Sequence, residues 1–223
     1  MTTVNAGSRA DTHDMYVVHR VFRRESALMP RLVRTVRPGD SVRARLVAGH
    51  FRDYALGLHH HHSAEDELLW PLLLARVDLE ADLVLRMEEQ HHRVADGLAV
   101  VEKLLPAWEA APSAATGVPI AAALASHTEA LHEHLGDEEQ FVLPLVEEHI
   151  TQAEWDRLGD RFATETPKDK LLFFLGALLE EATPDERQHM LGNLPVPAKL
   201  AWRFIGRRTY ARRIRDLRDP LAA

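Results

Sequence analysis

The sequence predicts an all-α protein, an up-down-up-down four-helix bundle with a C-terminal helical extension. Apolar residues recur at spacings of three and four over most of the chain, and no alternating strand pattern persists. Glycine and proline are few and cluster at the breaks between these segments. Four long segments of helical spacing are joined by short connections, which favours antiparallel packing of neighbouring helices.

Residues 1–150 are expected to hold the four long helices, after a disordered segment at residues 1–10. In the first helix, Met15 and Phe22 lie on one apolar stripe, as in a helix that packs against a core. The sequence Arg37-Pro38-Gly39-Asp40 predicts the turn that precedes the second helix. The four expected helices cover residues 11–36, 41–76, 79–108 and 118–149.

Length and composition limit the class of protein. A chain of 223 residues can bury one good core and a smaller appendage. Its 46% hydrophobic and 27% charged residues are typical of a soluble globular protein. The absence of cysteine excludes disulfides and thiolate metal ligands and is compatible with a reducing cytosol. No apolar run approaches the length of a membrane span and the N-terminus lacks a secretion signal, so a cytoplasmic location is expected.

One stretch of the sequence, His59–Pro71, recurs in altered form 73 residues later as His132–Pro144. Each copy contains His-x3-Glu, an acidic residue directly after the glutamate, and a proline ten residues beyond the histidine. On a helix, residues four apart share a face, so two such helices would present two imidazoles and two carboxylates to one centre. This arrangement predicts a dinuclear metal site. The two pairs are His61 with Glu65 and His134 with Glu138.

The first copy contains four consecutive histidines, of which only some can face a core. Four consecutive helical residues fan over roughly 300° around the axis. Alignment with the second copy selects His61 as the ligand. His59, His60 and His62 are therefore expected to lie outside the ligand set or to be exposed.

The first and third helices are expected to face the same centre, because the 73-residue offset makes the chain two related halves. His19 lies on the apolar stripe of the first helix. On the third helix the offset pairs His19 with His92, whereas the apolar stripe through Met87 and Val94 favours His91. We choose His91 as the ligand, with His92 as the alternative.

These residues, on four successive helices, resemble the hemerythrin-like (HHE cation-binding) family over roughly residues 11–150. The resemblance implies a non-haem diiron centre, with two iron ions bridged by Glu65, Glu138 and an oxygen species. The four histidines would then be terminal ligands. Imidazole and carboxylate donors also suit zinc or manganese. The predicted ligands are His19, His61, Glu65, His91, His134 and Glu138.

The sequence departs from oxygen-carrying members of that family in the third helix. Those members have a second histidine four residues from the first, whereas here Met87 and Ala95 occupy the positions four residues from His91. Four imidazoles would leave both metal ions open to exogenous ligands. We therefore expect turnover of a small oxidant (dioxygen, hydrogen peroxide or nitric oxide) rather than reversible oxygen carriage. A sensor or store without turnover is one alternative, and a structural metal site is another.

Two further residues are related by the 73-residue offset. Tyr54 and His127 each lie seven residues before a predicted ligand histidine, about 10 Å along the helix axis. Helical side chains tilt toward the N-terminus, away from the metals, so neither residue is expected to be a ligand. A tunnel, a proton relay or packing is the expected role.

Residues 151–223 are expected to form a separate helical extension. Thr151-x-x-Glu154 and Thr183-x-x-Glu186 have the form of capping boxes at helix starts. The apolar run at residues 171–175 should pack on the bundle or on a second subunit in a homo-oligomer. From Lys199 onward the chain carries a net charge of +6, against −7 for the whole chain. We expect this basic segment to pair with the acidic bundle, and expect no nucleic-acid partner, because no nucleic-acid-binding motif accompanies it.

Overall fold

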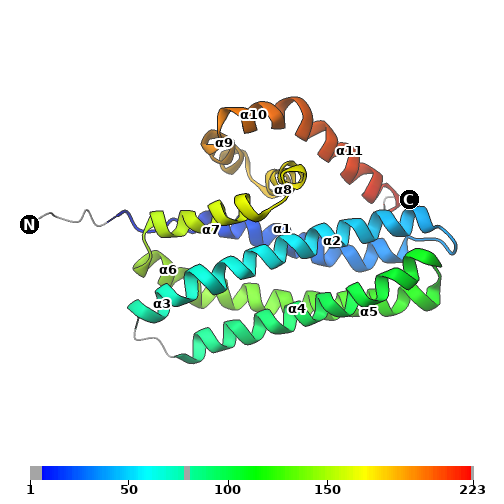
Figure 1. Ribbon diagram of the computed structural model, residues 1–223, viewed down its shortest axis with the longest axis horizontal. Coiled ribbons are helices and arrows are strands. Elements are labelled where there is room, and N and C mark those ends of the chain that lie inside the picture. Colours follow the sequence, from blue (N-terminus) through cyan, green and yellow to red (C-terminus); the bar gives the residue numbers. More distant parts are fainter. Residues whose placement is uncertain (1–6, 78–80, 222–223) are drawn as a thin grey trace, which may run out of the picture.

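The computed structural model describes residues 7–77 and 81–221 and confirms that the protein is all-α (Figure 1). Within these ranges the only β-type pairing is an isolated antiparallel bridge between Arg9 and Thr151. No helix in the described part of the chain is long and apolar enough to cross a membrane.

The chain forms eleven numbered α-helices in its described ranges, with four short π or 3₁₀ turns between or after them. The helices are α1 His13–Arg34, α2 Ser41–Ala64, α3 Trp70–Arg76, α4 Ala81–Ala110, α5 Ala114–Asp137, α6 Leu143–His149, α7 Gln152–Glu165, α8 Lys168–Glu181, α9 Pro184–Asn193, α10 Val196–Ala201 and α11 Arg207–Arg218. The π-turns are η1 Glu65–Leu69, η2 Glu138–Val142 and η3 Trp202–Gly206, and η4 Asp219–Leu221 is a 3₁₀ turn.

The four long helices α1, α2, α4 and α5 lie side by side along the longest axis of the molecule (Figure 1). Helix α5 packs along both α1 and α4, and α2 contacts α4 and α1. Because η1 and η2 join their neighbouring helices without a break, α2–η1–α3 and α5–η2–α6 correspond to the second and fourth helices expected from the sequence.

Two apolar clusters fill the space between these helices. One contains Phe22, Leu58, Val94 and Leu131 with their neighbours. The other lies around Trp70 and includes Met15, Leu69, Met87, Val142 and Trp155. Each long helix, together with the turn that continues it, contributes residues to both clusters. The middle stretch of every long helix therefore lies between the two clusters.

The turns η1 and η2 are offset by 73 residues and begin at the two glutamates of the repeat. The N–H of Trp70 donates to the carbonyl of Glu65, and the N–H of Leu143 donates to that of Glu138. A proline lies one residue beyond each of these donors, and a proline ring clashes with the carbonyl four residues earlier. A π-turn relieves such a conflict, and π-turns are frequent at functional sites.

The start of the described chain is tied to the end of α6. The N–H of Ala10 donates to the carbonyl of Ile150 at 3.0 Å, and the N–H of Gln152 donates to that of Ser8 at 2.8 Å. Disorder was expected for residues 1–10, and this is wrong for residues 8–10, because paired backbone groups fix them. Residues 1–6 lie outside the described residues.

The C-terminal helices cover one side of the long helices. Helix α7 packs on α2, and α8 packs on α1 and α11. The apolar run at residues 171–175 meets α2, where the rings of Phe173 and His50 lie 5.9 Å apart. A Cβ atom on Gly57 would lie 2.7 Å from Cε1 of Phe174, so glycine permits this close packing. Both expected capping boxes are present, at Thr151 and Thr183.

Basic side chains of the extension form ion pairs with the long helices. Lys170 and Arg213 each donate to the buried carboxylate of Asp53. Arg218 donates to Glu25 of α1 at 3.1 Å and, within the extension, to Glu180 of α8 at 2.7 Å. These contacts support the interpretation that the basic segment pairs with the acidic part of the chain.

Candidate metal centre

Seven histidine and glutamate side chains converge in the stretch between the two apolar clusters. They fall into two groups, and within each group the potential ligand atoms lie within 4.8 Å of one another. All six residues that the sequence predicted as ligands lie in these groups, and His62 lies there as well. One group is His62, Glu65, His91 and His134, and the other is His19, His61 and Glu138.

Each ligand owes its position to its helix. On α1, His19 lies between Met15 of one apolar cluster and Phe22 of the other. On α4, His91 lies between Met87 and Val94 in the same way. The apolar stripe of each helix therefore turns these histidines inward, as the helical spacing predicted. The pairs on α2–η1 and α5–η2 follow the same rule, since Leu58 and Leu69 flank one pair and Leu131 and Val142 flank the other.

The Glu65 carboxylate lies between the two groups. Its Oε1 is 3.3 Å from Nε2 of His61, and its Oε2 is 3.5 Å from Nε2 of His91. Two ligand atoms that are each about 2.1 Å from a shared ion lie about 3.0–3.4 Å apart. The separations at Glu65 are close to this range, so one oxygen faces each group.

The Glu138 carboxylate occupies the related position on η2. Its Oε2 is 3.2 Å from Nε2 of His19 and 3.7 Å from Nε2 of His134. His19 and His134 belong to different groups. Both carboxylates therefore lie near both groups, Glu65 with one oxygen toward each and Glu138 through Oε2 alone, so either could bridge two cations.

The atoms that point into this centre have no hydrogen-bond partner in the described structure. None of the seven residues is more than 9% exposed, and His61 is the one that reaches this value. Buried polar atoms are costly unless they are paired, and native proteins rarely leave them unpaired. Here they are gathered in one place, so the residues fit a bound pair of cations. The unpartnered atoms are Nε2 of His19, His61, His62, His91 and His134 and both oxygens of Glu65 and Glu138.

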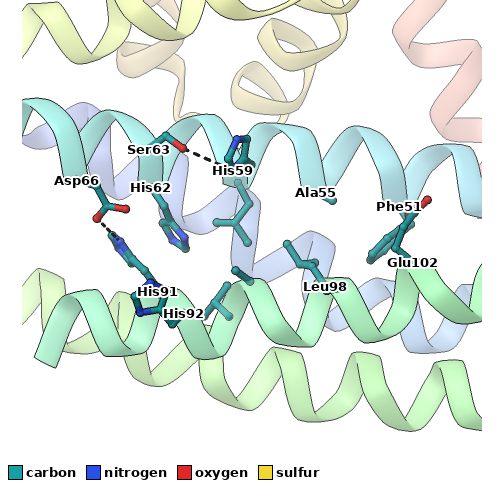
Figure 2. A pocket seen from close by; sticks show the side chains of 14 residues that line it. Phe51, Ala55, His59, His62, Ser63, Asp66, His91, His92, Leu98 and Glu102 are labelled. Atoms are coloured by element: carbon teal, nitrogen blue, oxygen red, sulfur yellow. Dashed lines mark hydrogen bonds and ion pairs between the residues drawn. The ribbon is translucent and has the colours of Figure 1, made fainter.

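The outer nitrogens of three of these histidines do have partners. Nδ1 of His19 lies 2.9 Å from Glu139, which also binds Arg23. Nδ1 of His91 lies 2.7 Å from Asp66, as Figure 2 shows. Such partners fix the ring and its tautomer, leaving the inner nitrogen free to bind a metal. His134 is held by Gln90 in the same way, at 3.3 Å.

The electrostatics of the centre call for positive charge. Burial, together with the charge of Glu138, raises the pKa of Glu65 to about 8. Burial also lowers the pKa of His61 and His62 well below 6.5, so both rings are neutral and can donate a lone pair. Although burial raises the pKa of Glu138, the neighbouring imidazoles, His19 above all, lower it, so the two carboxylates titrate apart.

His62 is the ligand candidate that the sequence analysis missed. It was expected to be exposed or outside the ligand set, but it is buried, and its ring stacks on that of His91 at 4.0 Å. Successive helical residues point about 100° apart, so His61 and His62 face the two groups separately. The alignment of the two copies could not reveal this, because Leu135 occupies the related position in the second copy.

Burial also decides between the neighbouring histidines on α4 and α2. His91 lies in the centre and is buried, whereas His92 is exposed. His59 is exposed, and His60 is half-buried with Nδ1 3.2 Å from Oγ1 of Thr166. Among the described residues, α2 thus brings two histidines into the centre, His61 and His62, whereas α4 brings only His91.

A cavity of about 390 Å³ lies between α2 and α4 and reaches His62 and His91 (Figure 2). Along the helices its wall is mainly apolar, with Leu58 of α2 and Leu98 of α4 among the lining residues. Ser63 and Asp66 line it at the end nearest the centre. The cavity therefore connects the surface between the two helices with one side of the metal centre.

Comparison with known proteins agrees with this geometry. A search of curated proteins and a search of solved structures each found no match. The model of one protein family, the hemerythrin HHE cation binding domain, matches residues 10–154 and so covers all seven residues of the centre. The chain therefore belongs to the hemerythrin HHE cation-binding family.

Proposed function

We propose that this protein holds two iron ions in an up-down-up-down bundle of α1, α2, α4 and α5 and that it binds and reduces a small oxidant, with hydrogen peroxide as the substrate. The observation that carries the proposal is the set of nine unpartnered, buried nitrogen and oxygen atoms that face one another in the centre. The remaining chain, residues 151–221, serves as a helical extension that docks on this bundle.

The two groups of residues support an assignment of the ligands. One ion would be held by His62, His91 and His134, and the other by His19 and His61. Glu65 and Glu138 would serve both ions. This donor set of imidazole and carboxylate suits iron, and it would also accept zinc or manganese. Iron is proposed because an iron pair supplies the electron transfer that reduction of an oxidant needs.

The unequal division of imidazoles indicates where the oxidant binds. From the sequence we expected four imidazoles and two open ions, and the position of His62 in the centre supports a fifth imidazole. The ion beside His62 has three imidazoles, and the ion beside His19 has two. A catalytic metal keeps an open coordination position, whereas a structural one does not. The ion held by His19 and His61 is therefore the proposed site of oxidant binding.

The cavity between α2 and α4 is the proposed entry route to the centre. It reaches the centre from the side of His62 and His91, so the oxidant would pass between the two ions to reach the open one. Its walls are mainly apolar, and small uncharged oxidants lose little on leaving water for such a surface. Ala95 lies on the α4 side of the cavity, so a large side chain there would narrow it. We expect Ala95→Phe to slow the reaction with peroxide while metal content stays unchanged, as stopped-flow and metal analysis would measure.

Oxygen sensing or storage without turnover is the second candidate, and the additional imidazole of His62 favours it. Reversible carriage needs one ion to be saturated so that dioxygen binds at the other alone and leaves intact. Three imidazoles and two carboxylates would come close to saturating the first ion. A site with only four imidazoles, as expected from the sequence, would leave both ions open and would not favour reversible binding in this way.

Metal analysis and rapid mixing would separate these functions. The protein purified from an iron-supplied source should contain about two iron ions per chain, as the two groups require. Supplied with a reductant of the phenol or ascorbate class, the protein should consume peroxide over many turnovers, and the reduced protein should be oxidised by dioxygen without a long-lived adduct. A stable adduct that reverses when oxygen is removed, without peroxide consumption, would establish the second candidate. Zinc as the native metal would reject both.

A further inference from the structure

We propose that Tyr54 is a redox-active tyrosine that gives one electron to the oxidised metal centre and, in the same step, its phenolic proton to His127. The proposal rests on the peroxide reaction proposed above. It assigns a role to two buried polar side chains that are not among the seven residues of the centre.

The first support is the pairing of Tyr54 with His127. The phenol oxygen of Tyr54, on α2, lies 2.7 Å from Nε2 of His127, on α5. Tyr54 is 4% exposed and His127 is 1% exposed, so the pair is shielded from bulk water. Burial raises the pKa of Tyr54 well above 10, so the phenol is protonated. The phenol therefore donates and His127 accepts through Nε2, which assigns the histidine proton to Nδ1.

The second support is a packed aromatic connection between Tyr54 and the centre. The ring of Phe22 lies 6.1 Å from that of Tyr54 and 5.1 Å from that of His61, between ring centroids. His61 is a ligand of the ion that we propose to be open. An electron leaving Tyr54 would thus cross one intervening ring to reach a metal ligand.

The third support is the cost of charge in this environment. A tyrosine that loses an electron but keeps its proton becomes a cation, and Tyr54 is surrounded by the apolar cluster around Phe22 and Leu58. Transfer of the proton to His127 keeps the oxidised ring neutral. Burial lowers the pKa of His127 to about 4, so the ring is neutral at physiological pH and can accept a proton. The oxidised phenol is a far stronger acid than the imidazolium, so the transfer is downhill.

The step balances with the reactants already named. Peroxide takes two electrons and two protons and is reduced to two water molecules. Tyr54 supplies one electron, a one-electron donor of the phenol or ascorbate class supplies the other, and the two protons come from that donor and from solvent. The O–H bond of Tyr54 breaks, its electron passes to the oxidised metal, and a new N–H bond forms at Nε2 of His127. A neutral phenoxyl radical remains on Tyr54. A one-electron donor of the phenol or ascorbate class then reduces the radical, and His127 returns the proton.

The other tyrosines of the chain provide controls, since there are three in all. Tyr16 is half-buried on α1, one turn before His19, and tests whether closeness to the centre is sufficient. Tyr210 donates to Glu180 at 2.6 Å and packs in the separate apolar cluster of α8 and α11. It tests whether a hydrogen-bonded, buried phenol is sufficient without proximity to the centre.

The test is rapid freezing of the iron-loaded full chain after peroxide is added, with the radical measured by electron paramagnetic resonance. The variants are Tyr54→Phe, Tyr16→Phe, Tyr210→Phe and His127→Gln. We expect a tyrosyl radical in the parent protein and in the Tyr16 and Tyr210 variants, and a loss of about tenfold or more in the Tyr54 variant. His127→Gln keeps a hydrogen-bond acceptor but removes the base, so it should also lower the radical yield about tenfold or more.

Each different outcome is decisive. Peroxide consumption with no radical, or with the same radical in Tyr54→Phe, overturns this inference and leaves the proposed function standing. Failure of the iron-loaded protein to react with peroxide overturns both. If Tyr54→Phe and His127→Gln lower the thermal unfolding temperature but leave the radical unchanged, the pair only joins α2 to α5 and the inference is wrong.

Discussion

Two pairs of buried carboxylates in this protein have similar burial and opposite surroundings. Glu65 and Glu138 are 0% exposed, and Glu25 and Asp53 are 5% and 3% exposed. The four oxygens of the first pair have no hydrogen-bond partner in the described structure. Every oxygen of the second pair is bound by a side chain of the protein itself. The oxygens of Glu65 and Glu138 therefore remain available to a bound ion, whereas those of Glu25 and Asp53 are already fully hydrogen-bonded within the protein.

The second pair joins the C-terminal helices to the long helices. One oxygen of Glu25 accepts from Arg24 at 2.9 Å and from Arg218 at 3.1 Å, and the other lies 2.8 Å from His50. Asp53 accepts from Lys170 and Arg213. Buried charges must be compensated, and here cations of α8 and α11 provide much of the compensation. Around Glu65 and Glu138 the neighbouring groups are imidazoles rather than lysine or arginine side chains, and bound metal ions would complete the compensation.

The largest expected effect is the loss of metal when a bridging carboxylate is removed. Glu65→Ala or Glu138→Ala should lose most of the bound metal, because each carboxylate serves both ions in the proposed centre. Glu67→Ala is the matched control, since Glu67 lies two residues from Glu65 but pairs with Arg161 at the surface. Metal analysis of the purified variants would measure this. Full metal content in both variants would show that Glu65 and Glu138 do not bind the metal, and the contrast with Glu25 and Asp53 would then be unfounded.

Loss of a single imidazole should have the next largest effect. His61→Ala and His62→Ala should each weaken metal binding by more than the roughly 10–100-fold typical of removing a residue that only orients a ligand. His59→Ala, an exposed neighbour, should leave binding unchanged. Competition with a chelator would give the affinities. If His62→Ala binds metal as tightly as the parent, the centre has four imidazoles after all.

Removal of Glu25 should affect stability rather than metal. Glu25→Ala leaves Arg218 and His50 without their shared carboxylate, and breaking a buried ion pair costs about 3–5 kcal/mol. Urea unfolding of the metal-loaded protein would measure the loss. Metal content should be retained, and its loss would show that the two buried clusters are not independent.

The same carboxylate predicts a pH dependence. Although burial raises its pKa, His50, Arg24 and Arg218 outweigh this and lower the pKa of Glu25 from 4.5 to about 2. A depressed pKa contributes stability that is present above the unfolded value and lost as pH falls through the folded one. The contribution, on the order of 3 kcal/mol, should therefore disappear between about pH 5 and pH 2. The unfolding free energies of the parent and of Glu25→Gln should converge over that interval.

The smallest expected effect is steric. Gly57→Ala places a Cβ atom against the ring of Phe174 and should destabilise the contact between α2 and α8 by about 1–3 kcal/mol, as overpacking does. Gly49→Ala is the control, because a Cβ atom there meets open space on the same helix. Calorimetry of the two variants would compare them. Equal stability would mean that α8 moves away freely.

Helical periodicity was sufficient to predict most of this structure from the sequence. It placed His19 and His91 on inward faces, and the repeat located both glutamates. It missed His62 because only one inward face was assigned to each helix. Two ion positions need ligands from two neighbouring faces of the same helix, here those of His61 and His62. The docking of the C-terminal helices depends on contacts between distant residues, such as Arg218 with Glu25, and no local pattern specifies these partners.

The turns η1 and η2 let one helix supply histidines to the centre and, further along, apolar side chains to the core. A π-turn is a helix with one additional residue, and one residue changes the angular phase of everything after it by about 100°. Before each turn, the helix presents its histidines to the centre. After it, Trp70 and Val146 return to the apolar cluster at the far end. Deleting a single residue at either turn would rotate that end of the helix out of the core, so the length of the chain at these two points is as much a part of the site as its ligands.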